Sequence, residues 1–426
     1  MSFKKIISSI LSCILIILVG TCISVNATDK KIIDAKYDLI TEVFDYGQQV
    51  NKVVIDLKTT IKGSTVNKNT FSVIAKNEVN GQKLDMATRL VTNVYISDSP
   101  LGDPSDYGEY IVLELEYGIN VSDAYTLFWD FRSFSNYPID LKYDVVQMFP
   151  IEDIEGNIVN NDNLKLSMNN VSNLLVDDFK KATSKTGLSY RHFEPAKDDK
   201  KNPLIIWLHG VGEGGVNNSS QISANRGGVA FITEDIQEKF GGAYVMAPQS
   251  PSYWMPSFTL GNLTINGDKD YTQDIIDLVT EYIRNNPDVD PTRVYIGGCS
   301  MGGYQTLKAI IATPDLFAAA FPTCAAYSPT NEELKKIGNL PVWFTHAKSD
   351  TTVPYTNSKD AYEYLKQFSD NAHYTEYETV NFNGIEHSGH SSWVYVLNND
   401  PKNEDGEHII DWISRQVNVY GHRWQN

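Results

Sequence analysis

The chain is short of cysteine and of positive charge. Of its 426 residues only 4 are cysteines, and only Cys299 and Cys324 lie beyond residue 27. Two cysteines cannot build a disulfide scaffold, so stability must come from a hydrophobic core. Lys and Arg number 36 against 53 Asp and Glu, which gives a formal net charge of −17. Together with the absence of a basic patch interleaved with aromatic residues, this charge argues against nucleic acid as a partner.

Histidine is also scarce, and this bears on metal binding. The 8 histidines do not have the spacing of a ligand cluster. The chemistry inferred below needs no metal either. We therefore predict neither a metal nor another cofactor.

A long apolar run that follows basic residues occurs at the N-terminus. MSFKK is followed by IISSILSCILIILVG and then by VNA, which ends at Ala27. The apolar part is too short and ends too abruptly for a membrane span, and small residues stand at a cleavage site. We expect residues 1–27 to be a removed signal peptide and the protein to be secreted, with no membrane partner afterwards. A lipidated Cys22 is the alternative, but Thr21 stands where a small residue would precede it.

Removal of this segment makes the chain more acidic. It takes away Lys4 and Lys5 and no acid, so the net charge becomes −17 − 2 = −19. Such a charge suits an extracellular, soluble enzyme. The oligomeric state is left open.

The pattern of apolar residues divides the remaining chain in two. Short runs of period 2, such as VVIDLKTTI (53–61) and YIVLELEY (110–117), are separated by turn signals such as Asn80-Gly81. They predict an all-β immunoglobulin-like sandwich over residues 28–165. The stretch DIEGNIVNNDNLKL (153–166) is interpreted as a linker or a last edge hairpin.

From residue 180 to 426 continuous apolar runs alternate with helical stretches. PLIIWLHG (203–210), RVYIGGCS (293–300) and PVWFTHA (341–347) are runs of the kind found in buried parallel strands. YTQDIIDLVTEYIRNN (271–286) carries its apolar residues on one stripe, as an amphipathic helix does. The alternation predicts a three-layer α/β domain with a mostly parallel sheet and helices on both faces.

A serine among glycines lies at the end of one predicted strand. The segment IGGCSMGG (296–303) places Ser300 between RVYIGG and the predicted helix GYQTLKAIIA. Gly298-x-Ser300-x-Gly302 at a strand-to-helix turn is the pattern of a nucleophile elbow, where side chains two residues before and after the serine would clash. A flexible loop or a phosphate-binding loop is the alternative, but Tyr304 stands where a P-loop would have lysine.

A serine nucleophile needs a base and an acid, and in this architecture they follow in the order acid, then histidine. Asp350 follows the strand PVWFTHA and is the predicted acid, although a turn aspartate would look the same. His387 and His390 follow in NGIEHSGHSSWVYV. We predict His390 as the base, because Gly389 allows a sharp bend there, and we interpret His387 as a solvated loop residue beside Glu386.

The oxyanion hole requires two backbone amides. Met301, directly after the serine, supplies one. LHGVGEGG (208–215) follows an early strand, and its glycines let the Val211 amide approach a substrate oxygen. His209 is interpreted as a residue that braces this loop, not as a base.

The motifs LHGVGEGG, GGCSMGG, HAKSDTTVP and GHSSW, in this order after a β-sandwich, resemble those of the secreted α/β-hydrolase esterases related to feruloyl esterases and polyhydroxyalkanoate depolymerases. Some members carry an immunoglobulin-like N-terminal domain. The resemblance covers residues 204–393 and implies carboxylic-ester hydrolysis with Ser300 as nucleophile, Asp350 as acid, His390 as base, and Val211 and Met301 as oxyanion donors. It implies a small-molecule or polysaccharide-linked ester as substrate, with acetyl or feruloyl esters of plant polysaccharide as one class.

Two other functions remain open from the sequence. A prolyl-oligopeptidase-type peptidase has the same triad order, but residues 28–165 are too few for its propeller. A carbohydrate-binding protein with a disabled hydrolase scaffold is disfavoured because no triad residue is missing. Independent carbohydrate binding by the sandwich is a further interpretation, although core packing explains most of its aromatic residues, among them Trp129 and Phe131.

Two further expectations concern the surroundings of Ser300. The sandwich is expected to wall the active site, and the loop that contains Trp254, Met255 and Phe258 is expected to line an apolar acyl pocket, with Trp254 in contact with substrate. The alternative for Trp254 is packing beneath the loop. Cys299 and Cys324 should lie on neighbouring strands, which permits a bridge, but two buried thiols are the preferred interpretation.

Overall fold

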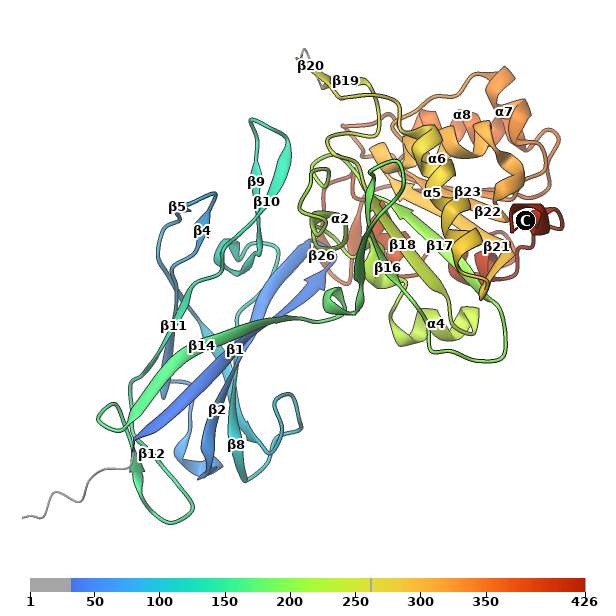
Figure 1. The fold of residues 1–426 in the computed structure, drawn as a ribbon. Helices are drawn as coiled ribbons and strands as arrows, with labels where there is room; N and C mark the ends of the chain where they lie inside the picture. Colours follow the sequence, from blue (N-terminus) through green and yellow to red (C-terminus); the bar gives the residue numbers. More distant parts are fainter. Residues whose placement is uncertain (1–31, 261–262, 426) are drawn as a thin grey trace, which may run out of the picture.

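The alternating apolar residues of the N-terminal part form a two-sheet sandwich (Figure 1). The computed structural model describes residues 32–260 and 263–425, so the predicted signal peptide lies outside the described residues. One sheet has the strand order β14-β1-β2-β8-β7 and the other β11-β3-β6. Their bounds are β1 (Ile33–Phe44), β2 (Gly47–Lys62), β3 (Phe71–Ala75), β6 (Ala87–Arg89), β7 (Val91–Ser97), β8 (Tyr107–Leu115), β11 (Tyr143–Gln147) and β14 (Leu164–Asn173).

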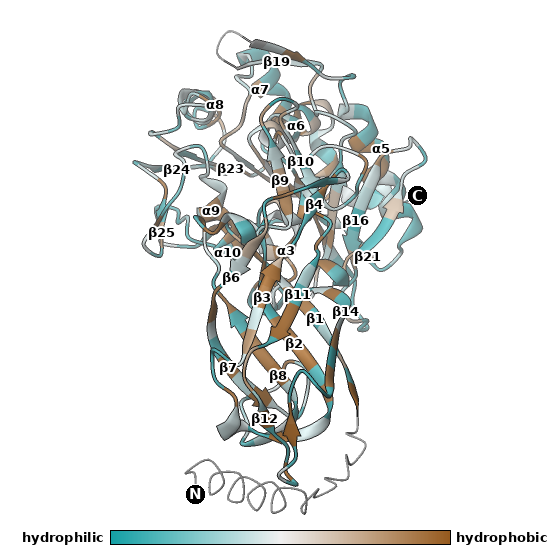
Figure 2. Ribbon diagram, turned by 90° about the vertical axis from the view of Figure 1, so that its left-hand side faces the viewer, coloured by the Kyte–Doolittle hydropathy of each residue, from teal (hydrophilic) through white to brown (hydrophobic). Residues whose placement is uncertain are grey.

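The core of the sandwich follows from the period of 2. In β3 the residues Phe71, Val73 and Ala75 point inward, and across the sandwich Val53 and Ile55 of β2 are fully buried. Figure 2 shows this apolar content as brown along β2, β3 and β8. Each aliphatic side chain buried in this way contributes roughly 1.5–3 kcal/mol to stability.

The sandwich includes more of the chain than its sequence indicates. β14 pairs in parallel with β1, from Ile33 opposite Leu164 to Thr41 opposite Asn173. The predicted boundary at residue 165 falls inside this strand. The sequence favours a linker or edge hairpin for residues 153–166, because this stretch is rich in Asn. An edge strand with an exposed face needs few apolar residues, so the start of β14 is not recognisable from its composition.

Short hairpins extend from the sandwich. They are β4 (Glu78–Val79) with β5 (Gln82–Lys83), β9 (Leu127–Asp130) with β10 (Ser135–Pro138), and β12 (Ile151–Glu152) with β13 (Ile158–Val159). The β9–β10 hairpin projects from the sandwich towards the second domain (Figure 1). It places residues far from Ser300 in the sequence near the loops of that domain.

The second domain is built on an eight-stranded sheet of order β15-β16-β18-β17-β21-β22-β23-β24. β15 and β16 are antiparallel to their neighbours, and the remaining pairs are parallel. The strands are β15 (Lys180–Thr183), β16 (Ser189–Phe193), β17 (Asn202–Leu208), β18 (Tyr244–Gln249), β21 (Val289–Cys299), β22 (Ala319–Thr323), β23 (Val342–Ala347) and β24 (Ala372–Tyr377).

Helices cover both faces of this sheet. One core holds residues of α5 (Thr272–Asn285), α6 (Met301–Ala312), α7 (Asn331–Ile337) and α8 (Thr356–Leu365). The opposite core holds residues of α2 (Ser220–Ser223), α3 (Gly227–Ala230), α4 (Glu234–Phe240), α9 (Trp393–Leu397) and α10 (Ile409–Ser414). The predicted three-layer α/β domain behind a β-sandwich is therefore confirmed.

Two further hairpins, β19 (Ser257–Leu260) with β20 (Leu263–Asn266) and β25 (Asn381–Phe382) with β26 (Ile385–Glu386), lie outside the main sheet.

The domains meet at the β9–β10 hairpin and at the turn after β1. At the hairpin the Tyr253 hydroxyl donates to the Ser133 carbonyl at 3.0 Å. At the turn the Asn398 amide donates to the Asp45 carboxylate at 2.9 Å, and Arg226 donates to the Asn398 side-chain oxygen.

Within residues 32–260 and 263–425, no helix combines the length and the apolar character of a membrane span.

Candidate active site

Ser300 occupies the turn between β21, which ends at Cys299, and α6, which begins at Met301. Its φ of 57° and ψ of −115° are a strained conformation for a residue with a side chain. A Cβ at Gly298 would lie 2.5 Å from the Leu208 carbonyl oxygen, and a Cβ at Gly302 only 1.9 Å from the same atom. Both positions therefore require glycine, which is the reason the sequence has this cluster.

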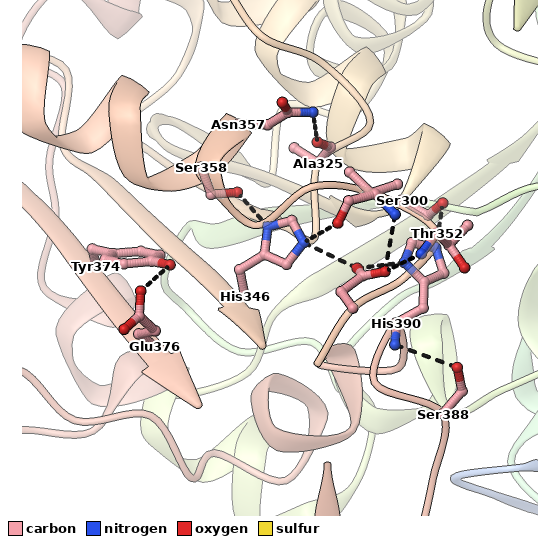
Figure 3. Close-up of polar contacts among 12 residues, drawn as sticks. Ser300, Ala325, His346, Thr352, Asn357, Ser358, Tyr374, Glu376, Ser388 and His390 are labelled. Atoms are coloured by element: carbon pink, nitrogen blue, oxygen red, sulfur yellow. Dashed lines mark hydrogen bonds and ion pairs between the residues drawn. The ribbon is translucent and has the colours of Figure 1, made fainter. Parts of the chain in front are cut away.

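The predicted base and acid form a hydrogen-bonded chain with Ser300. His390 Nε2 lies 2.8 Å from Ser300 Oγ, and His390 Nδ1 lies 2.7 Å from Asp350 Oδ2. A carboxylate accepts only, so Nδ1 carries the hydrogen and Nε2 is free to accept the serine proton. Figure 3 shows Ser300 and His390 directed towards each other.

The environment of Asp350 favours its charged form. Oδ1 accepts the amides of Thr352 at 2.8 Å and Val353 at 2.9 Å, and Oδ2 accepts from His346 Nε2 at 3.0 Å in addition to His390. Burial by itself would raise the pKa of this carboxyl, but the hydrogen bonds from the two histidines and the charge of His390 outweigh burial and lower the pKa below its usual range. Asp350 is thus held as an anion that can orient and stabilise the base.

The other histidine of this loop, His387, and its neighbour Glu386 lie away from Ser300. The amide of His387 donates to the Val380 carbonyl at 2.8 Å, and its Nε2 is buried without a partner among the described residues. Burial lowers the pKa of its imidazole. Glu386 is exposed in the β25–β26 hairpin. Neither residue contacts Ser300 or Asp350 in the described chain.

The two predicted oxyanion donors face the same cavity as Ser300. Val211 and Met301 both line it, and neither amide has an acceptor within the part of the chain that the structure describes. The peptide that carries the Val211 amide is fixed through its oxygen, because the Gly210 carbonyl accepts from His209 Nδ1 at 2.7 Å. His209 Nε2 accepts from the Ser250 amide at 3.1 Å. Burial lowers the pKa of His209 to about 4, so this histidine is neutral and acts as a brace.

A buried glutamate holds the other side of the same loop. Glu213 Oε2 accepts from the Gly210 amide at 3.1 Å, and Oε1 accepts from the Asn225 side chain at 2.8 Å. Burial, only partly offset by these two hydrogen bonds, raises the pKa of Glu213 to about 8. The sequence motif LHGVGEGG contains this residue but does not by itself indicate that it is buried.

Ser300 lines a cavity of about 520 Å³. Its apolar lining comes from both domains: Trp129 and Phe134 of the β9–β10 hairpin, and Val211, Met255, Phe258, Val353, Pro354 and Trp393 of the second domain. A cavity of this size and character suits an uncharged small ligand.

Trp254 requires a correction. It is fully buried and is absent from the cavity lining. Its Nε1 donates to the His209 carbonyl at 2.9 Å, and its ring lies 4.8 Å from the His209 ring. The predicted contact with substrate is replaced by packing beneath the loop, because the indole nitrogen finds its partner there. Of the residues in its loop, Met255 and Phe258 line the cavity instead.

Cys299 and Cys324 are free and buried, and burial raises the pKa of both thiols. They behave as small apolar residues of the core, not as a bridge.

Sequence reasoning missed Trp129 and Phe134 as cavity residues and His346 as a partner of Asp350. For aromatic residues such as Trp129 and Phe131 the sequence favours core packing, yet Phe131 is 77% exposed and Trp129 lines the cavity. Periodicity gives the direction of a side chain relative to its own sheet and does not reveal a contact with another domain. For His346 the sequence offers one indication of a contact with Asp350, namely that it stands four residues before that aspartate.

Comparisons with known proteins agree with this architecture. Residues 36–160 match the family described as "Esterase Ig-like N-terminal domain", and residues 194–399 match "Phospholipase/Carboxylesterase". The poly(3-hydroxybutyrate) depolymerase of Ralstonia pickettii is 26% identical over 155 residues, which are 36% of this chain and 30% of that protein, so the match spans less than a third of that relative's length.

One solved structure is similar over nearly its full length. It is a thermostable esterase with 31% sequence identity and a TM-score of 0.75, covering 89% of this chain and 99% of that chain. Because the similarity covers 89% of this chain, it includes both the sandwich and the catalytic domain. The two family models match these domains in the same order. The chain therefore belongs to the carboxylesterases of the α/β-hydrolase fold that carry an immunoglobulin-like N-terminal domain.

Proposed function

We propose that this protein hydrolyses uncharged carboxylic esters through an acyl-enzyme on Ser300. The observation that carries the proposal is the Ser300–His390–Asp350 chain, with distances of 2.8 and 2.7 Å, which opens into the apolar cavity. A free serine hydroxyl is nearly inert at neutral pH, and a histidine oriented by a buried carboxylate activates it.

In the proposed first half-reaction His390 Nε2 takes the Ser300 proton while Oγ attacks the ester carbonyl carbon. The amides of Val211 and Met301 donate to the oxygen as it becomes an anion. His390 then donates its proton to the alkoxide of the leaving alcohol, and the acyl group stays on Ser300. A water molecule repeats the sequence, with His390 as base, and releases the carboxylic acid.

The cavity supports a preference for apolar or aromatic acyl groups. Eight of its lining residues are the apolar side chains named above, whereas a charged acyl group would be desolvated without a pairing charge from them. Feruloyl esters fit this description, and acetyl esters of plant polysaccharide and 3-hydroxybutyrate esters are further candidates. The N-terminal segment supports secretion, which would give access to such polymers.

The test is a substrate panel assayed with the wild-type protein and with Ser300→Ala. We expect turnover of p-nitrophenyl acyl esters and methyl ferulate, and a loss of roughly 10⁶ in turnover for Ser300→Ala with the fold preserved. Acetylated xylan and poly(3-hydroxybutyrate) decide the polymer class. Cleavage of chromogenic peptides in place of esters would favour a peptidase, and esterase activity that survives in Ser300→Ala would refute the proposal.

A further inference from the structure

Gly210 and Gly212, the residues on either side of Val211 in the loop after β17, have backbone groups held at three points. The first two belong to the catalytic domain: Glu213 accepts from the Gly210 amide at 3.1 Å, and His209 donates to the Gly210 carbonyl at 2.7 Å. The third point is the Gly212 carbonyl, and its partner comes from the sandwich. Val211, whose amide is the proposed oxyanion donor, lies between these fixed groups.

Asn136 of β10 donates twice to the Gly212 carbonyl oxygen. Its backbone amide lies 2.7 Å from that oxygen, and its side-chain Nδ2 lies 3.1 Å from it. In the described chain the Gly212 carbonyl accepts from no other residue. This carbonyl therefore depends on the sandwich domain for its hydrogen bonds.

The Trp129 ring packs over the same glycine. Gly212 has a φ of +95°, and a Cβ there would lie 2.2 Å from Trp129 Cζ3. Only glycine can adopt this conformation and admit the ring at this distance. The β9–β10 hairpin thus contacts Gly212 with a hydrogen-bonding residue on one strand and an aromatic ring on the other.

The hairpin is itself anchored to the catalytic domain. The Tyr253 hydroxyl donates to the Ser133 carbonyl at 3.0 Å. Within the hairpin, Ser133 Oγ donates to Asp130 at 2.8 Å and the Tyr137 hydroxyl donates to Ser133 Oγ at 3.2 Å. An anchored hairpin can restrain the loop that it touches.

We propose that Asn136 of the immunoglobulin-like domain is a positioning residue that holds the oxyanion loop in its catalytic conformation. An oxyanion hole accelerates a reaction only when its donors are already oriented before charge develops. A loop that contains Gly210, Gly212, Gly214 and Gly215 has many accessible conformations, because glycine loses more conformational freedom on folding than any other residue. The sandwich restrains this freedom at Gly212.

The inference rests on the proposed function and is tested in the full-length protein. Asn136→Asp keeps the size of the side chain but places a carboxylate oxygen against the Gly212 carbonyl oxygen, whereas Asn136→Ala only removes the side-chain hydrogen bond. We expect kcat to fall in the order Asn, Ala, Asp, with a loss of about tenfold or more for Asp, less than the 10²–10³ that follows removal of an oxyanion donor. The KM should change little.

A second readout separates the oxyanion loop from general damage. Sulfur accepts hydrogen bonds poorly, so the ratio of kcat/KM for an ester to that for its thionoester reports the oxyanion donors. This ratio should fall in both Asn136 variants. It should stay near the wild-type value in Asp350→Asn, which impairs the base, and in Tyr137→Phe, which removes a hydrogen bond within the same hairpin.

The outcomes are distinguishable. An unchanged kcat and an unchanged ratio in a folded Asn136→Ala would overturn the inference, and so would a loss of kcat with the wild-type ratio. Melting temperatures of each variant establish folding, and Asn136→Ala serves if Asn136→Asp does not fold. Failure of the proposed function is a separate result, because wild-type protein would then show no activity that depends on Ser300.

Discussion

His346 and His390 donate hydrogen bonds to the same oxygen of Asp350, at 3.0 and 2.7 Å. His346 is fully buried, and its Nδ1 lies 2.9 Å from the Ser358 hydroxyl of α8. Because Nε2 faces the carboxylate, it carries the hydrogen and Nδ1 accepts from Ser358. Figure 3 shows His346 between Ser358 and the triad. The Asp350 carboxylate is therefore shared between the proposed base, His390, and the buried His346.

This sharing predicts a change in the pH profile. His346→Phe removes one of the two histidine donors that hold the pKa of Asp350 below its usual range, so this carboxyl should take up its proton at a higher pH. The acidic limb of the kcat/KM profile, where Asp350 loses its charge, should therefore move to higher pH, and kcat should fall about tenfold, less than the 10²–10⁴ that general acid–base catalysis contributes. Activity of the wild-type and variant proteins between pH 4 and 9 measures both.

The control for His346 is His346→Gln, whose amide can still donate to Asp350 and should retain most of the wild-type profile. Other charged groups near His346 remain in both variants: Glu376 is its register partner on β24 and is paired with Lys348 at 3.1 Å and Lys359 at 3.9 Å. Equal losses in Phe and Gln variants, without a shift of the limb, would make His346 a packing residue only.

The choice between the two histidines of the 387–390 loop gives a sharper test of the base. His390→Ala should lower kcat by at least 10⁴, because it removes the only imidazole that the structure places against Ser300 Oγ in the described chain. His387→Ala should retain a substantial fraction of activity. Initial rates with one p-nitrophenyl ester are sufficient, and melting temperatures exclude unfolding. The reverse pattern would transfer the role of base to His387.

The Ser300–His390–Asp350 arrangement was predictable because its residues are dictated locally. Gly298 and Gly302 are required by the approach of the Leu208 carbonyl, and the motif around Ser300 records that requirement. The acid and the base then follow from chain order on strands whose ends meet at one edge of the sheet. The same reasoning gave the three layers of the catalytic domain, since long buried strands and amphipathic helices have distinct periods.

The contributions that the sequence did not reveal are contacts between distant segments. Trp129 contacts Gly212 across a domain interface, and β14, from the end of the sandwich sequence, pairs with β1 from its beginning. Trp254 could equally have lined the cavity or packed below it, because an amphipathic ring satisfies either environment. The structure distinguishes the two positions, because the Trp254 indole nitrogen lies 2.9 Å from the His209 carbonyl and the ring therefore packs below the cavity.

The cavity residues of the hairpin predict substrate selectivity. Trp129→Ala enlarges the cavity beside Ser300 and removes the ring over Gly212, so kcat/KM should fall for short acyl chains by about tenfold relative to long ones, since each buried methylene is worth about 0.8 kcal/mol. A series of p-nitrophenyl esters from acetate to decanoate measures the preference. Phe131→Ala is the matched control, since this ring is 77% exposed on the same hairpin and does not line the cavity. An identical preference in all three proteins would remove Trp129 from the acyl site.

Glu213 predicts how stability depends on pH. Burial raises the pKa of its carboxyl from 4.5 to about 8, so the folded state binds this proton more tightly than the unfolded state. Its contribution to the free energy of unfolding is fully present below pH 4.5 and is lost as the pH rises through about 8. Glu213→Gln cannot titrate. The protonated carboxyl can accept at both oxygens, from Gly210 and from Asn225, whereas the amide of glutamine accepts only through its oxygen and so replaces one of these two hydrogen bonds. The variant should therefore be less stable than wild type at pH 5, and the difference should narrow as the pH approaches 8. Denaturant unfolding of both proteins at pH 5 and at pH 8 measures the difference in their free energies of unfolding. Glu386→Gln, at an exposed glutamate, is the control and should follow wild type. Parallel stability profiles for wild type and Glu213→Gln would show that this carboxyl does not titrate between the two states.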